Sequence, residues 1–219
     1  TYYVQNHFGY SPFKSGVAFL PMIAALVATA ITAGRLIVPR LGARGTLPLG
    51  LALVAVAFLI FSRMTPESTY AQVALPGLIA FGSGLGLTMP VAFNSGTRGV
   101  DARRTGLASA ILSAAQQIGG SFGVALMTSY ATQHAEDYVT DHTEEVKATA
   151  MEMMMRAQAL PQSSAGKQII ESLKAQLIDR AQIEAYSGGF SMMAWILAGA
   201  VAVLAVCGIG LSLRRHRRR

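Results

Sequence analysis

Long runs without a single Asp, Glu, Lys or Arg dominate the chain. Five such runs, each 18 to 31 residues long and mostly apolar, occupy residues 15–34, 45–62, 68–97, 105–135 and 185–213. A helix that rises ~1.5 Å per residue needs about 20 residues to cross a hydrocarbon core of about 30 Å. A charge at the centre of such a helix costs about 2.5–3.5 kcal/mol on insertion scales. The pattern therefore predicts an all-α, polytopic transmembrane helix bundle with five full spans.

The elements can be placed along the chain from these runs. We expect the spans at residues 16–37, 46–62, 69–94, 105–132 and 186–213, with a short loop at residues 39–45 between the first two. Residues 1–8 are interpreted as the last two turns of a preceding helix, so the chain is expected to be the C-terminal portion of a longer protein. The predicted division is residues 1–133 for the helix end and four spans, 134–185 for an extracytoplasmic helical loop, and 186–219 for the last span and a basic cytoplasmic tail.

The polar segment before the last span repeats apolar residues at intervals of three and four. One repeat covers residues 146–160 and the other covers residues 169–181, with a helix-breaking stretch at 161–166 between them. This spacing predicts a pair of amphipathic helices. The methionine-rich stretch at residues 151–155 fits two interpretations: an adaptable surface for a partner protein, or a stripe that packs on the second helix or rests on lipid headgroups.

Charge is divided unequally between the two sides of the predicted membrane. The net charge is +7, and 13% of the residues are charged, against about 25% in a soluble domain. Because successive loops alternate sides, one side receives eleven basic residues and one acid, and the other receives seven basic residues and ten acids. The positive-inside rule places the arginine-rich side, with the C-terminus, in the cytoplasm. The basic tail at residues 214–219 is expected to contact anionic lipid and no nucleic acid, because no aromatic residue is interleaved with its charges.

The sequence holds no pattern typical of a catalytic or metal site. It has no His-Glu-x-x-His and no Gly-x-Ser-x-Gly motif, and its single cysteine, Cys207, has no second cysteine to pair with. An enzyme is therefore not expected, and neither a metal nor an organic cofactor is predicted. The five spans also lack Asp and Glu, so a carboxylate that couples transport to protons is expected outside them.

Glycines recur in the third span at helical spacing. Gly82 and Gly86 form a small-xxx-small pair, which predicts close packing against another helix and also suits a helix that slides or bends during gating. A dinucleotide-binding motif is not indicated, because Leu87 stands where the third glycine would be and no strand precedes it.

The fourth span carries a polar stripe. Ser109, Ser113, Gln116 or Gln117, and Gly120 fall on one helical face. A glutamine in the middle of a bilayer is costly unless it faces protein or water, so we expect this face to point inward. It serves either hydrogen bonds between helices or contact with a substrate.

Ordered motifs along the chain resemble those of a transporter family. They are Gly-Tyr-Ser-Pro at residues 9–12, Gly-Arg-Leu at 34–36, Arg-Leu-Gly-Ala-Arg at 40–44, Phe-Gly-Ser-Gly-Leu-Gly at 81–86, Gln-Gln-Ile-Gly-Gly-Ser-Phe-Gly at 116–123 and Ala-Tyr-Ser-Gly-Gly-Phe at 185–190. In this order they resemble the EmrB/QacA-type efflux permeases, the fourteen-span drug:proton antiporter branch of the major facilitator superfamily. The resemblance implies the C-terminal half of such a transporter in a bacterial inner membrane.

The resemblance also implies a cytoplasmic gating loop. Its residues, with the two arginines of the next inner loop, are Gly34, Arg40, Gly42, Arg44, Arg103 and Arg104. Pro39 stands where the family's loop commonly has an aspartate, and one residue is inserted after Gly34.

A substrate cavity is expected from the third and fourth spans. The residues predicted to line it are Ser113, Gln116, Gln117, Asn94 and Thr88. The family often has Asn and Arg at the positions of Ser113 and Gln116, and Gly188 replaces a common aspartate in the last motif. These departures imply an altered substrate range.

These features together predict a secondary transporter that exports small hydrophobic or cationic compounds by drug:proton antiport with alternating access. The fragment is expected to be inactive without the missing N-terminal half. Expected partners are the lipid bilayer, the small substrate, that missing half and, in double-membrane bacteria, a periplasmic adaptor protein. Two alternatives stay open: an exporter of a physiological amphipathic metabolite, and a membrane scaffold that acts through the outer helix pair.

Overall fold

The structure, a computed structural model, describes residues 10–65, 68–156 and 164–216. Every regular element within these residues is a helix, which confirms the predicted all-α class. The helices are α1 (Pro12–Ala18), α2 (Leu20–Thr32), α3 (Val38–Phe61), α4 (Leu75–Thr97), α5 (Thr105–Arg156) and α6 (Ser164–His216), with π-helical turns at Ala33–Ile37 and Tyr70–Ala74 and a 3-10 turn at Ala102–Arg104. The helix end predicted at residues 1–8 lies outside the described residues.

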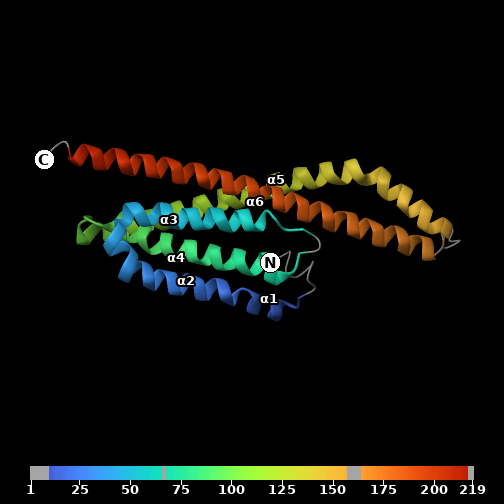
Figure 1. The fold of residues 1–219 in the computed structure, drawn as a ribbon, viewed down its shortest axis with the longest axis horizontal. Helices are drawn as coiled ribbons and strands as arrows, with labels where there is room; N and C mark the ends of the chain where they lie inside the picture. The colour runs from blue at the N-terminus through green and yellow to red at the C-terminus, as the bar shows by residue number, and fades with distance from the viewer. Residues whose placement is uncertain (1–9, 66–67, 157–163, 217–219) are drawn as a thin grey trace.

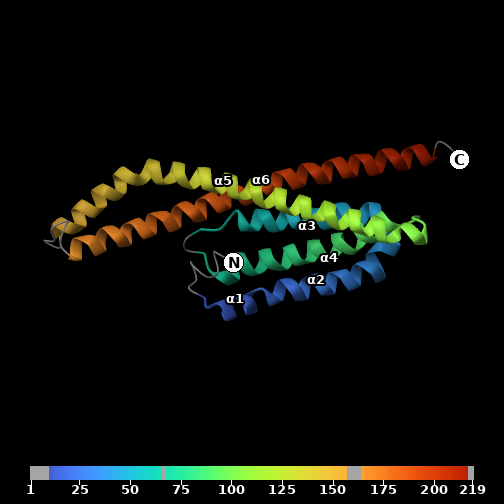
Figure 2. The same cartoon turned by 180° about the vertical axis from the view of Figure 1, so that it is seen from behind.

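The helices form an elongated antiparallel bundle with a projecting arm. Helix α4 packs along both α2 and α3, while α6 packs along α3 and α5. Helices α5 and α6 run past the bundle and continue together beyond the end at which α3 stops and α4 begins, as both views show (Figures 1 and 2). Four helical stretches in the described chain have the length and apolar character of a membrane span: Pro12–Phe61, Tyr70–Thr97, Ala102–Glu144 and Ile170–Ala205. The first of them contains two of the five predicted spans.

A single glycine separates those two spans. Gly42 has φ 64° and ψ 174°, and the residues on both sides of it are helical. A positive φ of this kind is readily adopted only by glycine, so the chain changes direction here within one residue. Thr46, one turn after Gly42, is buried. Its hydroxyl donates a hydrogen bond to the carbonyl oxygen of Gly42 at 2.8 Å. The loop predicted at residues 39–45 is therefore wrong in extent, because the break is confined to Gly42.

Close glycine contacts hold α4 against its two neighbours. A Cβ atom added at Gly82 would collide with the carbonyl oxygen of Met22 in α2. One added at Gly84 would lie 2.6 Å from Val54 Cγ2 and 2.7 Å from the carbonyl oxygen of Gly50, both in α3. The packing role predicted for the glycine-rich span is thus confirmed, and its glycines face two helices rather than one.

Aromatic side chains pack together at the end of the bundle where α3 ends. The Phe190 ring of α6 stacks on Phe58 with centroids 5.8 Å apart and meets Phe61 at 5.3 Å. The Tyr70 hydroxyl donates to the carbonyl oxygen of Ala18, 2.5 Å away, and so ties the start of the α4 span to the end of α1. These contacts define the end of the bundle from which the arm departs.

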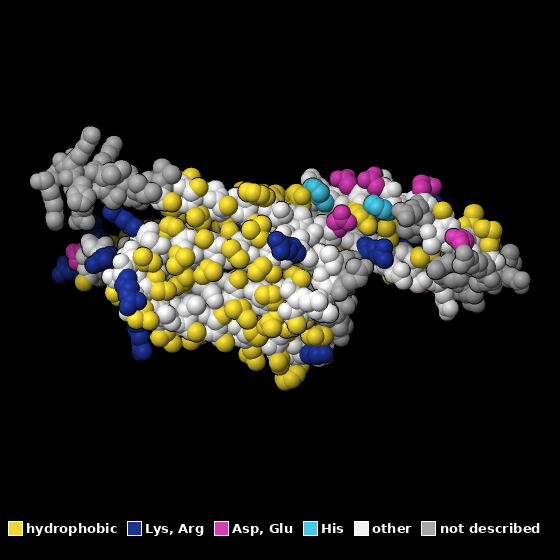
Figure 3. Space-filling model, in the orientation of Figure 1, with side chains coloured by type: hydrophobic (Ala, Val, Ile, Leu, Met, Phe, Trp, Pro, Cys, Tyr) yellow, Lys and Arg dark blue, Asp and Glu magenta, His cyan; other side chains and the backbone are white. Residues whose placement is uncertain are grey.

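The arm is made by the outer parts of α5 and α6. The amphipathic helices predicted at residues 146–160 and 169–181 are not separate elements, since residues 146–156 continue α5 and residues 169–181 belong to α6. Half of the predicted break at 161–166 lies outside the described residues, and residues 164–166 form the first turn of α6. Met151 and Met155 of the arm are both exposed. Figure 3 shows acidic side chains along the arm and a group of Lys and Arg at the opposite end of the bundle.

Candidate functional site

The polar stripe predicted in the fourth span lies on the membrane-length part of α5. Ser113, Gln116 and Gln117 are all exposed, and no residue in the most apolar 18-residue window of this stretch is buried. The Gln116 amide donates to the Met89 sulfur of α4 at 3.4 Å, which is a weak bond. Gln116 lies about 16 Å along the axis from Thr105, close to the middle of a hydrocarbon core of about 30 Å. The described part of the chain therefore leaves a polar helix face uncovered at mid-membrane depth.

The opposite face of the same segment is apolar. Ile111 is 61% exposed, Ile118 71% and Phe122 64%. These positions are roughly half a helical turn away from Ser113, so α5 presents lipid-compatible side chains on one side and amide and hydroxyl groups on the other. Such an arrangement fits a helix that lies between lipid and a hydrated or protein-covered interior.

A second feature is a cavity at the arginine-rich end of the bundle. Its volume is about 460 Å³. It brings together Gly34 and Gly42 of the predicted gating loop and Asn94 of the predicted substrate cavity. Arg98 also lines it, although the sequence did not single out this residue as part of a site. Its position at the end of α4 in an arginine-rich loop is the only sequence signal that points to it.

A π-helical turn sits on one wall of this cavity. It covers Ala33–Ile37 and includes Gly34 and Arg35. A π turn holds one residue more per hydrogen-bonded ring than an α turn, so it accommodates a single inserted residue without ending the helix. This turn can therefore hold the single inserted residue that the resemblance implies after Gly34.

The remaining residues predicted for gating, Arg40, Arg44, Arg103 and Arg104, are exposed. Figure 3 shows a group of basic side chains at the end of the bundle opposite the arm. None of the four forms an ion pair with an acid among the described residues. Asp101 caps the 3-10 turn, where its carboxylate accepts from the Arg103 backbone N–H at 3.3 Å.

Thr88 lies apart from the other predicted cavity residues. Its hydroxyl donates to the carbonyl of Gly84 at 2.8 Å, and the side chain is part-buried against Gly50. The structure thus distributes the five predicted residues over three places: the face of α5, the inner cavity with Asn94, and the α3–α4 contact with Thr88.

Comparison with known proteins agrees with this architecture. The family model of the major facilitator superfamily matches residues 1–124. The chain is 37% identical to the puromycin resistance protein of Streptomyces alboniger over 153 residues, which cover 68% of this chain and 30% of that protein. It is 35% identical over 131 residues to the multidrug resistance protein Stp of Mycobacterium tuberculosis, covering 59% of this chain and 24% of that protein.

A third relative matches nearly the full length of the chain. The tetracenomycin C resistance and export protein of Streptomyces glaucescens is 26% identical over 213 residues, which cover 94% of this chain and 38% of that protein. The chain thus spans well under half the length of these relatives. Because the family model matches more than half of its residues, the chain belongs to the major facilitator superfamily.

Proposed function

We propose that the chain acts as the C-terminal half of an exporter of the EmrB/QacA-type fourteen-span branch, moving small hydrophobic or cationic compounds out of the cell in exchange for protons. Three relatives bear names of drug resistance or export, and the motif order quoted above supports the branch. In this proposal the arginine-rich end and the C-terminus are cytoplasmic, and the arm projects from the outer face of the bacterial inner membrane.

The uncovered polar face of α5 is the observation that carries the proposal. Amide and hydroxyl groups exposed at mid-membrane depth are costly against lipid, so a second bundle or water must cover them. In secondary transporters the substrate site lies near the midplane between two repeats that rock against each other. Ser113, Gln116 and Gln117 are therefore assigned to the wall of that site, facing the N-terminal half.

The cavity at the inner end is assigned to gating. Gly42 is the one residue within α3 that leaves the helical conformation, and Gly34 and Arg98 lie on the same cavity. Closure of the inner side would bring this end against the other half of the transporter. In that closed state the exposed arginines pair with acidic side chains or with helix C-termini of the other half.

Proton coupling is assigned to a carboxylate outside the five spans, because residues 16–37, 46–62, 69–94, 105–132 and 186–213 contain neither Asp nor Glu. The chain by itself is accordingly expected to carry out no proton-driven transport. Proton-dependent dye efflux from vesicles that contain this chain alone would contradict this part of the proposal.

The α5 face is tested by Gln116→Leu in the complete transporter. Loss of one polar contact is expected to lower resistance to a transported drug by up to about tenfold, with protein abundance unchanged. Ile118→Leu on the opposite face is the matched control and should retain resistance. An equal fall in resistance and in protein abundance would show that Gln116 contributes to packing and not to substrate contact.

A scaffold that works through the arm is the second candidate, favoured by the exposed methionines Met151 and Met155 at its outer part. Deleting residues 143–183 separates the two functions. A transporter keeps partial efflux after this deletion, whereas a scaffold loses its activity completely.

A further inference from the structure

Helix α5 carries a line of polar side chains from the proposed central site to the outer end of the bundle. Its members are Ser113, Gln117, Ser121, Thr128, Thr132 and Glu136, and all of them are exposed. The intervals are four residues, or seven between Ser121 and Thr128, and with ~3.6 residues per turn these steps together rotate the row by about 140° between Ser113 and Glu136. At ~1.5 Å per residue the row is about 35 Å long. The polar groups therefore wind around α5 on their way outward, from the face of Ser113 to nearly the opposite face at Glu136.

The line ends in a groove between α5 and α6. The groove has a volume of about 570 Å³, within the range of roughly 300–1,000 Å³ that small-molecule sites occupy. Its floor includes Ala131, Ala181 and Ala185, which are 7%, 1% and 2% exposed. Tyr186 on its rim lies one helical turn from Phe190, whose ring stacks on Phe58 of α3. The groove thus opens just beyond the outer end of the bundle.

The side-chain oxygens that line the groove can accept hydrogen bonds from a ligand. Glu136 is the only charged side chain in its lining, and it forms no ion pair with a described residue. The side-chain oxygen of Gln182 is buried and receives no hydrogen bond within the described part of the chain. A buried acceptor without a donor is rare in folded proteins and is usually satisfied by water or a ligand. The exposed Glu136 carboxylate above an apolar floor suits an apolar molecule with a positive N–H group, and the buried Gln182 oxygen can accept from this group once its side chain turns toward the groove.

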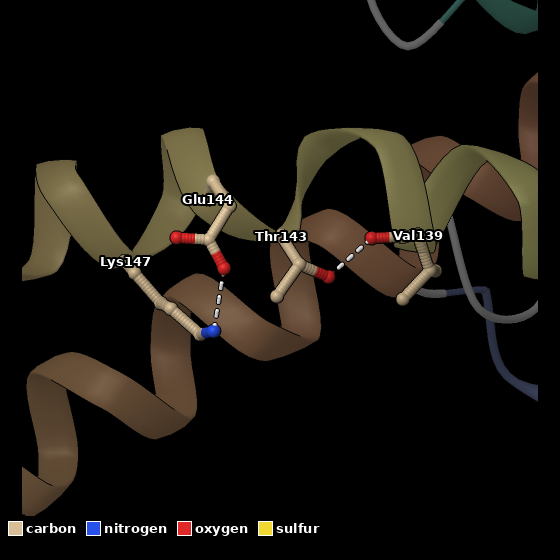
Figure 4. Close-up of polar contacts among 4 residues, drawn as sticks. All are labelled: Val139, Thr143, Glu144 and Lys147. Carbon is tan, nitrogen blue, oxygen red and sulfur yellow. Dashed lines mark hydrogen bonds and ion pairs between the residues drawn. The ribbon is translucent and has the colours of Figure 1, made fainter.

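The nearest lysine along α5 does not compete for Glu136. Lys147 pairs with Glu144 at 2.7 Å, and the Thr143 hydroxyl donates to the carbonyl of Val139, another residue of the groove lining (Figure 4). The nearest lysine on α5 is thus engaged two turns or more beyond the groove. An anionic ligand is disfavoured, because it would meet the Glu136 carboxylate without a described cation in the lining.

We propose that this groove is an outer binding site for an amphipathic organic cation, held by Glu136 and by the Gln182 side-chain oxygen over the alanine floor. The winding polar row on α5 leads from the proposed midplane site toward the groove. The direction of travel rests on the proposed export function. Binding in the groove does not, and it can be measured separately.

The test is protection of a thiol in the groove. Thr132→Cys is introduced into the complete protein after Cys207 and any cysteine outside residues 1–219 have been replaced by serine, and intact cells are treated with a membrane-impermeant maleimide. Ethidium, as the cationic probe, is expected to slow alkylation at Thr132→Cys at least threefold, and the anionic dye fluorescein is expected to have no effect. Gln133→Cys, also exposed but outside the groove lining, should show no protection.

Charge variants then identify the group that binds the probe. Glu136→Gln is expected to raise the ethidium concentration needed to protect the thiol by about three- to tenfold. Glu136→Asp retains most of the protection, and so does Asp137→Asn, which removes an equal charge from an exposed neighbour outside the lining. The alkylation rate without ethidium checks that each variant keeps the groove. Absence of protection, or equal protection in Glu136→Gln and Asp137→Asn, overturns the proposal.

Ethidium efflux from the same cells separates this inference from the proposed function. Protection without efflux supports the groove and contradicts export of this cation. Efflux without protection supports export and overturns the groove as a binding site.

Discussion

The approach of α3 and α4 is set by two facing glycines, and enlarging one of them gives a measurable prediction. In Gly84→Ala the new methyl group would lie 2.6 Å from Val54 Cγ2 and 2.7 Å from the carbonyl oxygen of Gly50. Because the oxygen belongs to the backbone and cannot rotate away, the helices must separate by roughly 0.5–1 Å. Such overpacking costs about 1–3 kcal/mol, and the better helix propensity of alanine returns at most ~1 kcal/mol. We expect a net loss of about 1–2 kcal/mol.

Thermal unfolding of the purified protein in detergent measures this loss. For a chain of this size it corresponds to a fall in Tm of about 2–8 °C. Gly120→Ala is the matched control, because a Cβ atom there meets nothing within 4 Å, and it should leave Tm unchanged or raise it. If Gly84→Ala were as stable as Gly120→Ala, the two helices would not approach as closely as described and the glycine argument would fail.

Three further changes test other contacts by the same Tm measurement. Tyr70→Phe removes the hydrogen bond to Ala18 and should cost about 0.5–1.5 kcal/mol; no change would mean that this bond does not hold α1. Phe190→Ala removes the ring contacts with Phe58 and Phe61 and should cost about 1–3 kcal/mol, whereas Phe190→Leu should lose less. Gly42→Ala places a side chain at φ 64° and should cost about 1–2 kcal/mol, while Gly34→Ala, with equally open space, should be neutral or stabilising; equal effects would contradict the turn at Gly42.

The hydropathy pattern predicts the spans well because lipid imposes a simple rule. Each long uncharged run is helical in the structure. Gly82 and Gly86 lie in close helix contacts, as expected. The same rule does not predict how far α5 continues past the span. A span was predicted to end near residue 132, where charges begin, yet the helix continues to Arg156. Charged residues end the contact with lipid but do not end a helix, and neither Gly nor Pro occurs between Gly123 and Arg156.

The inner turn shows the opposite error. Residues 39–45 contain a proline and two glycines, a composition typical of a loop. The structure places Pro39 in the first turn of α3, where its missing N–H is not required, and only Gly42 leaves the helical conformation. Which glycine takes the positive φ is decided by how α2 and α3 meet α4, and this depends on tertiary contacts that composition does not contain.

The set of candidate site residues divides for a similar reason. Spacing along one helix fixes which residues share a face, so the stripe of Ser113, Gln116 and Gln117 was predictable from α5 alone. Spacing does not fix how α4 is rotated relative to α5. In the structure that rotation directs Met89 to Gln116, whereas Thr88 lies against Gly50 and Asn94 lines the inner cavity.

The way α5 is held explains why one helix carries both the proposed central site and the outer groove. Glycines bring α2, α3 and α4 into close contact, whereas α5 contacts α4 chiefly where Leu112 meets Gly96 and Gln116 meets Met89. Its membrane-length part therefore keeps its faces largely uncovered, and the row of polar side chains that starts at Ser113 winds around the helix into the arm, where α6 closes the groove around Glu136. If a second half of the transporter covers the Ser113 face, a shift of this half that moves α5 also moves the wall of the groove that carries Glu136. Access to the midplane site and to the groove would then be coupled through one rigid helix.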